Sequence, residues 1–176
     1  MAPALAPRWP LKAFTSDGVE YRIRPISRAD IERERDFIRR MSPQSRYSRF
    51  MHEFREPPDA LVAKLVDVDH HDSMALIALH GTGDGESIVG VARYAADAGT
   101  DTCEFAVAVA DDWQCRGIAS TLIPELFAHA ARQGFREIYG TILAANQRMI
   151  ELAEWLGMTV DPPGDGDTVR AWRRIG

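Results

Sequence analysis

The chain has 176 residues, of which 45% are hydrophobic and 27% charged, and its formal net charge is −5 at pH 7. A chain of this length is expected to fold as one domain whose core needs no metal, and two cysteines are too few for a disulfide framework. The acidic balance argues against nonspecific nucleic-acid binding, and no apolar run approaches the roughly 20 residues of a membrane-spanning helix. We therefore expect a cytoplasmic protein that binds neither nucleic acid nor a membrane.

The N-terminus contains several prolines and lacks the apolar segment of a secretory signal. We expect residues 1–18 to form an extended or flexible tail and residues 19–176 to form a single domain. The first strand is predicted over residues 21–26, where Tyr21 and Ile23 alternate with arginines.

Three helices are predicted next. The first is capped by Ser27 and ends near Arg40, with acidic residues in its first turn and arginines in its last. The second begins at Ser42-Pro43, which suit the N-cap and the first helical position, and the third covers residues 59–66. The apolar side chains of the second helix have helical spacing and are expected to pack in the core: Tyr47, Phe50 and Met51.

The rest of the chain alternates between strands and helices. Apolar runs bounded by turn residues predict strands over residues 73–80, 87–94, 102–109, 137–143 and 169–173. One helix is predicted before Gly134, and another from Asn146 to a C-cap at Gly157. This order predicts an α/β fold of the mixed α+β kind, with a mostly antiparallel sheet flanked by helices.

A possible catalytic carboxylate lies on the predicted strand 102–109. Because side chains alternate along a strand, Glu104, Ala106 and Ala108 share one face. A carboxylate followed by two small residues leaves a groove over the strand, and we expect Phe105 beside it to shield it from water. Such a group suits a general base near neutral pH. From spacing alone, a structural ion pair with an arginine is an equal alternative.

The loop after this strand has the features of an anion site. The predicted strand leads into a helix through Gln114-Cys115-Arg116-Gly117-Ile118-Ala119. Such a connection directs backbone N–H groups and the helix dipole at one point. Gly117 permits a close approach of the backbone to a ligand. The Gly-Lys-Ser/Thr sequence of nucleotide triphosphatases is absent, which disfavours ATP or GTP hydrolysis. A nucleophilic role for Cys115 is conceivable at a helix N-terminus, but we favour its being an ordinary loop residue.

Two motifs carry a resemblance to a known family. The first is Gln114-x-x-Gly117-x-Ala119, and the second is Asn146 followed by Met149, Leu152 and Leu156-Gly157. Together they resemble the pyrophosphate-binding signature and the last helix of GCN5-related N-acetyltransferases (GNATs), and the order of elements matches that fold over residues 20–176. A narrower resemblance, to the acetyltransferase domain of bacterial Pat-type protein-lysine acetyltransferases, lies in Ile23-Arg24-Pro25-Ile26, in residues 41–50 and in residues 104–109.

The resemblance implies a function as well as a fold. It implies a six- to seven-stranded sheet with splayed central strands, acetyl-CoA as cosubstrate, no metal, and direct attack by a primary amine in a ternary complex. A protein lysine is the expected acceptor and Glu104 the expected general base. The alternatives are a small-molecule amine as acceptor and a non-catalytic acyl-CoA-binding module. A homodimer is possible by family analogy.

The resemblance also implies where acetyl-CoA would bind. The pyrophosphate would lie on the amides of residues 115–120 and the pantetheine along residues 107–109, with an N–H there polarising the thioester carbonyl. The residues expected to bind acetyl-CoA are Val107, Ala108, Val109, Gln114, Cys115, Arg116, Gly117, Ile118, Ala119, Ser120, Asn146 and Met149. Many GNATs have a tyrosine on the last helix that protonates the leaving thiolate. This chain has Ala153 there, so Tyr94 and Tyr139 are the candidate substitutes.

Overall fold

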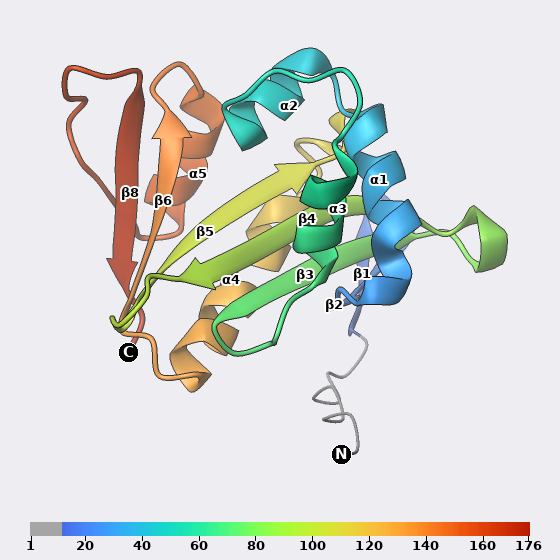
Figure 1. Cartoon of the computed structure of the whole chain (residues 1–176), viewed down its shortest axis with the longest axis horizontal. Helices are drawn as coiled ribbons and strands as arrows, with labels where there is room; N and C mark the ends of the chain where they lie inside the picture. The colour runs from blue at the N-terminus through green and yellow to red at the C-terminus, as the bar shows by residue number, and fades with distance from the viewer. Residues whose placement is uncertain (1–11) are drawn as a thin grey trace.

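The fold is built on one mixed sheet (Figure 1). The computed structural model describes residues 12–176, and within them the sheet has eight strands in the order β1-β2-β3-β4-β5-β6-β8-β7. The strands are β1 Lys12–Ser16, β2 Val19–Pro25, β3 Ser73–His80, β4 Ser87–Ala96, β5 Thr102–Val109, β6 Glu137–Leu143, β7 Thr159–Val160 and β8 Thr168–Arg174. The α-helices are α1 Ile31–Arg40, α2 Pro43–Phe50, α3 Asp59–Val66, α4 Ile118–Arg132 and α5 Gln147–Trp155. The predicted mixed α/β fold is confirmed.

The sheet begins earlier in the chain than expected. Strand β1 pairs antiparallel with β2, from Lys12 opposite Ile23 to Ser16 opposite Val19, and the ring of Phe14 stacks on that of Tyr21 with centroids 5.6 Å apart. Five residues assigned to the N-terminal tail are therefore part of the sheet. Residues 1–11 of that predicted tail lie outside the described residues. The short strand β7 was also not predicted, and these two strands raise the number above six to seven.

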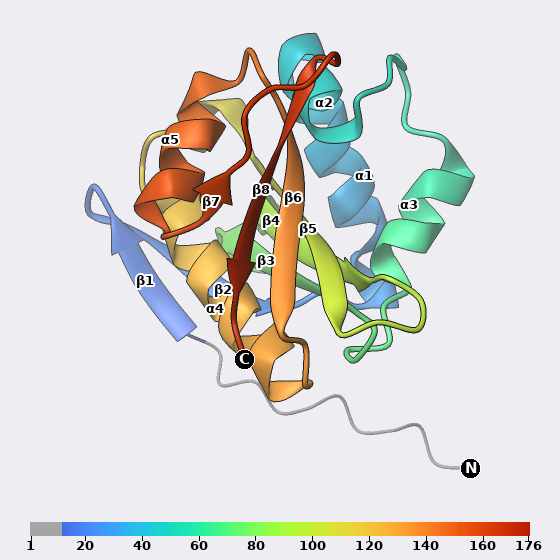
Figure 2. The ribbon, with the colours of Figure 1, turned by 90° about the vertical axis from the view of Figure 1, so that its left-hand side faces the viewer.

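The helices cover both faces of the sheet. Figure 2 shows α4 and α5 on one side and α1, α2 and α3 on the other. Helix α4 approaches β4 closely because Gly90 has no side chain: a Cβ there would lie 2.7 Å from a methyl group of Ile118. On the opposite face, Arg93 of β4 bonds to Glu34 of α1. Each face of the central strands thus meets a different set of helices.

Strands β5 and β6 diverge from one another. They run parallel and pair at three positions in the described part of the chain, the last being Glu104 opposite Tyr139, while β6 continues along β8 to Leu143. Phe105 packs against the backbone of Gly140, where a Cβ would lie 2.7 Å from its ring. The ring thus lies close to the point where the strands separate, and Figure 1 shows them diverging toward α2 and α5.

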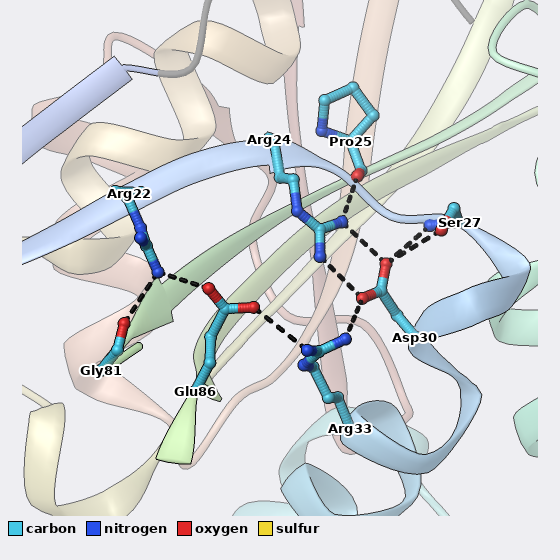
Figure 3. A network of polar contacts seen from close by, with 8 residues as sticks. All are labelled: Arg22, Arg24, Pro25, Ser27, Asp30, Arg33, Gly81 and Glu86. Carbon is cyan, nitrogen blue, oxygen red and sulfur yellow. Dashed lines mark hydrogen bonds and ion pairs between the residues drawn. The ribbon is translucent and has the colours of Figure 1, made fainter. Parts of the chain in front are cut away.

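A polar network joins β2, α1 and the β3–β4 turn (Figure 3). The carboxylate of Asp30 is 1% exposed and accepts hydrogen bonds from Arg24 at 2.7 and 2.8 Å and from the amide of Ser27 at 2.9 Å. Arg33 contacts Asp30 and also Glu86, at 3.2 and 3.3 Å. Burial opposes ionisation of Asp30, but the bonds from Arg24 and Ser27 outweigh it and lower the pKa of the carboxyl group.

We expect Asp30→Asn to lower the free energy of unfolding by about 2 to 3 kcal/mol, because it removes the buried anion that two arginines contact. Since the pKa of Asp30 is lower in the folded state, this stabilisation is present above about pH 4 and is lost as the pH falls further. Urea unfolding at pH 7 and pH 3 measures both effects. Asp36→Asn, which removes an exposed carboxylate from α1, should cost less than about 0.5 kcal/mol. Equal losses for the two variants would contradict the prediction.

Candidate active site

A large cavity lies where β5 and β6 diverge. Its volume is about 1440 Å³, and its walls come from β5, β6, α2, α5, the loop before α4 and the first turn of α4. Of the residues expected to bind acetyl-CoA, those that line this cavity are Val107, Ala108, Val109, Gln114, Cys115, Gly117, Ile118, Ala119, Ser120, Asn146 and Met149. Arg116 is not among the lining residues, and its guanidinium lies over the ring of Trp113, 5.2 Å from the centroid.

One edge of β5 faces the cavity. Pairing with β6 ends at Glu104 in the described residues, whereas residues 105–109 all line the cavity. On its other edge β5 stays paired with β4 as far as Val109. A strand edge of this kind offers backbone N–H and C=O groups to an extended ligand, much as a neighbouring strand would.

The loop before α4 has the backbone of an anion cradle. Cys115 and Gly117 both have left-handed conformations, with φ of 60° and 82°, which is uncommon for a residue other than glycine. Such alternation turns successive N–H groups toward one point, and α4 begins directly after it at Ile118. A Cβ on Gly117 would meet only the hydroxyl of Ser120, at 3.5 Å. The positive φ of Gly117, rather than lack of space, is therefore what favours glycine.

The side chain of Gln114 supports this loop from within. Its amide nitrogen donates to the carbonyl of Val109 at 3.3 Å and to Asp111 at 3.2 Å. Asp111 also accepts hydrogen bonds from the amide of Ser42 and the hydroxyl of Ser45, and these bonds lower the pKa of its carboxyl group although burial opposes them. The N-terminus of α2 is thus tied to the loop before α4. Sequence reasoning missed this link, which joins residues far apart in the chain.

Glu104 lies at the position where β5 and β6 separate. Its carboxylate accepts a hydrogen bond of 3.1 Å from the hydroxyl of Thr141, and Thr141 lines the cavity. The expectation that Phe105 shields Glu104 is wrong, because Glu104 is exposed and Phe105 points to the other face, edge-on to Phe127. Among residues 12–176 Glu104 forms no ion pair, so the structural alternative is not found there.

The tyrosines suggested as proton donors lie elsewhere. The hydroxyl of Tyr94 contacts the carbonyl of His71 at 2.9 Å and the ring of His129 at 3.1 Å, and burial raises its pKa. The hydroxyl of Tyr139 donates to Asp97, and neither tyrosine lines the cavity. Ala153 is buried. The tyrosine that lines the cavity is Tyr47 of α2.

Helix α2 is a wall of the cavity, and of the three residues expected to pack in the core only Phe50, which is partly buried, packs against it. Tyr47 and Met51, expected to be buried, are 39% and 36% exposed, and Tyr47, Ser48 and Arg49 line the cavity. Helical spacing alone did not reveal this, because α2 presents these residues to a groove formed by strands that follow much later in the chain. Trp155 of α5 also lines the groove and is 73% exposed.

A group of charged residues lies behind α2. Arg93 donates hydrogen bonds to Glu34 and to the carbonyl of Leu65, both at 2.8 Å. Burial, followed by the charge of Arg93, lowers the pKa of Arg49 to about 10, while Glu34 and Glu104 oppose this shift. Burial raises the pKa of Glu34. The charges of Arg49 and Glu104 therefore interact across this part of the site.

Residues 12–176 contain no group of three or more histidine, cysteine, aspartate or glutamate residues placed to hold a metal ion. In the same residues, no helix combines the length and apolar character required to cross a bilayer.

Comparisons with known proteins agree on one family. The model of the acetyltransferase (GNAT) family matches residues 35–158. Acetyltransferase PA5475 of Pseudomonas aeruginosa is 42% identical over 153 residues, which are 86% of this chain and 82% of that protein. The GNAT domain of PAT from S. lividans superimposes with a TM-score of 0.84 at 28% identity, covering 96% of this chain and 100% of that domain. Spermidine N-acetyltransferase from Vibrio cholerae, solved with CoA and spermine, has the same fold at 15% identity, with a TM-score of 0.69 over 88% of this chain and 95% of that one.

Proposed function

The chain belongs to the acetyltransferase (GNAT) family and is an acetyl-CoA-dependent N-acetyltransferase; we propose that its acceptor is the side-chain amine of a protein lysine and that Glu104 is its general base. The observation that carries the base assignment is the position of Glu104. Its carboxylate lies where β5 and β6 separate, bonds to a residue that lines the cavity, and has no ion-pair partner in the described residues.

The cavity suits a long, bent anionic cosubstrate. In this proposal the pyrophosphate of acetyl-CoA lies on the amides of residues 115–120, where left-handed residues and the start of α4 favour an anion. The pantetheine follows the open edge of β5 at residues 107–109. Asn146 and Met149 contribute from the start of α5. Arg116 contributes its backbone amide to this arrangement, while its guanidinium lies over Trp113.

The proposed reaction is a direct transfer. The acceptor nitrogen attacks the thioester carbonyl carbon, the C–N bond forms, and the C–S bond breaks to release the CoA thiolate, which takes up the second proton that the nitrogen loses. An alkylammonium ion has a pKa of roughly 10.4 and must lose a proton before it can attack. Glu104 accepts that proton, and an N–H of the β5 edge stabilises the negative charge on the carbonyl oxygen.

The position of Cys115 favours this direct route over an acyl-cysteine intermediate. The cradle follows the C-terminal end of β5, and Glu104 lies five residues before that end at Val109. Five strand residues span roughly 17 Å. Cys115 therefore belongs to the end proposed for the pyrophosphate, away from the reacting amine.

The choice of a protein acceptor rests on similarity and on the shape of the site. The resemblance to Pat-type enzymes extends over the whole GNAT domain of S. lividans PAT. The cavity wall also carries two exposed aromatic side chains, Tyr47 and Trp155, that a polypeptide could contact. A small amine remains the alternative acceptor. We further propose a cytoplasmic enzyme that forms a homodimer.

We expect radiolabelled acetyl-CoA to modify lysines in proteins of a cell lysate, and CoA release with polyamines or single amino acids to be at least tenfold slower. Mass spectrometry of the labelled proteins and a thiol-reactive dye for CoA measure the two activities. Glu104→Gln serves as the control for nonenzymatic acetylation. The variant should lose the enzymatic labelling and leave the nonenzymatic labelling unchanged. Rapid acetylation of a small amine with no labelled protein would favour the alternative acceptor.

A further inference from the structure

Arg49 is a charged side chain in the cavity wall whose hydrogen-bonding capacity is unused. Its guanidinium lies 4.8 Å from the centroid of the Phe50 ring, and it lines the cavity. Within residues 12–176 no hydrogen bond or ion pair uses its nitrogens. A guanidinium has five N–H donors arranged as a fork that fits a carboxylate.

The surrounding charges leave this guanidinium available. Arg93 is the residue that bonds directly to Glu34, at 2.8 Å. The second oxygen of Glu34 is buried without a hydrogen-bond partner, so Arg49 influences Glu34 through its charge and not through a hydrogen bond. Two guanidinium groups therefore accompany one buried carboxylate. Of the two, Arg49 is the one that lines the cavity and is not bonded to Glu34.

Arg49 and Glu104 together give the acceptor end of the site a positive and a negative group. Arg49 lines the same cavity as Thr141, and the hydroxyl of Thr141 bonds to the carboxylate of Glu104 at 3.1 Å. An acceptor that carried only an ammonium group would be attracted by Glu104 but repelled by Arg49. An acceptor with a carboxylate beside its amine pairs with both.

We propose that Arg49 binds a carboxylate that the acceptor carries next to its reactive amine, while Glu104 receives the proton of that amine. This rests on the proposed role of Glu104 and adds the chemical class of the acceptor: an amine accompanied by a carboxylate. In a protein the carboxylate belongs to an aspartate or glutamate beside the target lysine. In a free amino acid it is the α-carboxylate.

Two matched pairs of acceptors test the proposal. The first pair is a peptide with aspartate next to the acceptor lysine and the same peptide with asparagine. The second is lysine and lysinamide. For wild type we expect kcat/KM to be at least tenfold higher for the member with the carboxylate in one pair or both. A preference in the peptide pair identifies the carboxylate as an acidic side chain, and a preference in the second pair identifies it as the α-carboxylate.

Variants assign the preference to Arg49. Arg49→Gln should bring the ratio of the two kcat/KM values close to one. Arg49→Lys should keep part of the preference for the acceptor with the carboxylate, because a lysine supplies the positive charge without the forked N–H donors of a guanidinium. Arg46→Gln is the matched control from the same helix. Its guanidinium bonds to the carbonyl of Arg55 at 2.7 Å and does not line the cavity, so the ratio should stay at the wild-type value.

Three results would overturn the proposal. A wild-type ratio near one in both pairs, with both members acetylated, leaves the N-acetyltransferase function intact but removes the carboxylate. An unchanged ratio in Arg49→Gln, with both rates equally lowered, makes Arg49 a structural counter-charge for Glu34. Absence of acetylation in every pair, with a protein that binds acetyl-CoA, overturns this proposal together with the assigned acceptor. If Arg49→Gln fails to fold, the wild-type ratios and Arg49→Lys decide.

Discussion

Glu104→Gln is expected to lower kcat by about 10²- to 10⁴-fold at pH 7.5, the contribution that a positioned general base usually makes. Glutamine keeps the size of the side chain and a hydrogen-bonding partner for Thr141, which lies 3.1 Å from the carboxylate, but it cannot accept the proton of an ammonium ion. The affinity for acetyl-CoA should change little, because the cradle at residues 115–120 is distant from Glu104. Steady-state CoA release and calorimetric titration with CoA measure the two quantities.

The pH dependence makes this prediction specific. The requirement for a base decreases as the acceptor amine itself loses its proton, which for an alkylammonium occurs near a pKa of about 10.4. The defect of Glu104→Gln should therefore be largest near neutral pH and become smaller toward pH 10. Glu137→Gln is the matched control, since Glu137 begins the adjacent strand β6 and bonds to Arg170. Wild-type turnover by Glu104→Gln at pH 7.5 would rule out the base assignment.

The second large effect is expected at the anion cradle. Gly117→Val should weaken CoA binding by about 5- to 30-fold, because Gly117 has φ of 82° and a left-handed conformation costs an L-residue roughly 1 to 2 kcal/mol. The loop relieves that strain by leaving the conformation in which its N–H groups converge. Titration of CoA into the variant, followed by calorimetry, gives the change in Kd.

Gly99→Val controls for backbone strain alone. Gly99 has φ of 74° and nothing within 4 Å of a Cβ, and it lies in the turn between β4 and β5. Both valine variants should lose a similar amount of thermal stability, but Gly99→Val should bind CoA like wild type. The cradle is not the pyrophosphate site if both variants retain the wild-type Kd, or if both lose affinity equally.

Local patterns predicted the elements on which these experiments depend. The alternation along β5 correctly separated Glu104 from Phe105, because a strand directs successive side chains to opposite faces whatever surrounds it. The glycine at position 117 marked the left-handed residue before α4 for a similar reason, since few other residues adopt that conformation at low cost. Cys115 shares the conformation, and nothing in its residue type signalled this.

Predictions about burial and neighbours were less successful. Tyr47 has the spacing of a core helix, yet it is exposed because it lines the cavity. Met51 is also exposed, and it follows the last residue of α2 in a left-handed conformation. Lys12–Ser16 has too few apolar residues to stand out as a strand, and pairing with β2 is what makes it part of the sheet. Phe105 does not shield Glu104, because it lies on the opposite face against α4 and Gly140.

The sequence by itself determined the order of the helices and of all the described strands except β1 and β7, the face on which Glu104 lies and the glycine of the cradle. These features depend on backbone conformations that neighbouring residues dictate. Only the tertiary structure decided that β5 and β6 separate after Glu104 and that α2 forms a wall of the resulting cavity. It also decided that Arg49, with its donors unused, lines the same cavity as Thr141, the hydrogen-bond partner of Glu104. These features depend on packing between residues that are distant in the chain, and no local pattern of residues specifies which of them will meet.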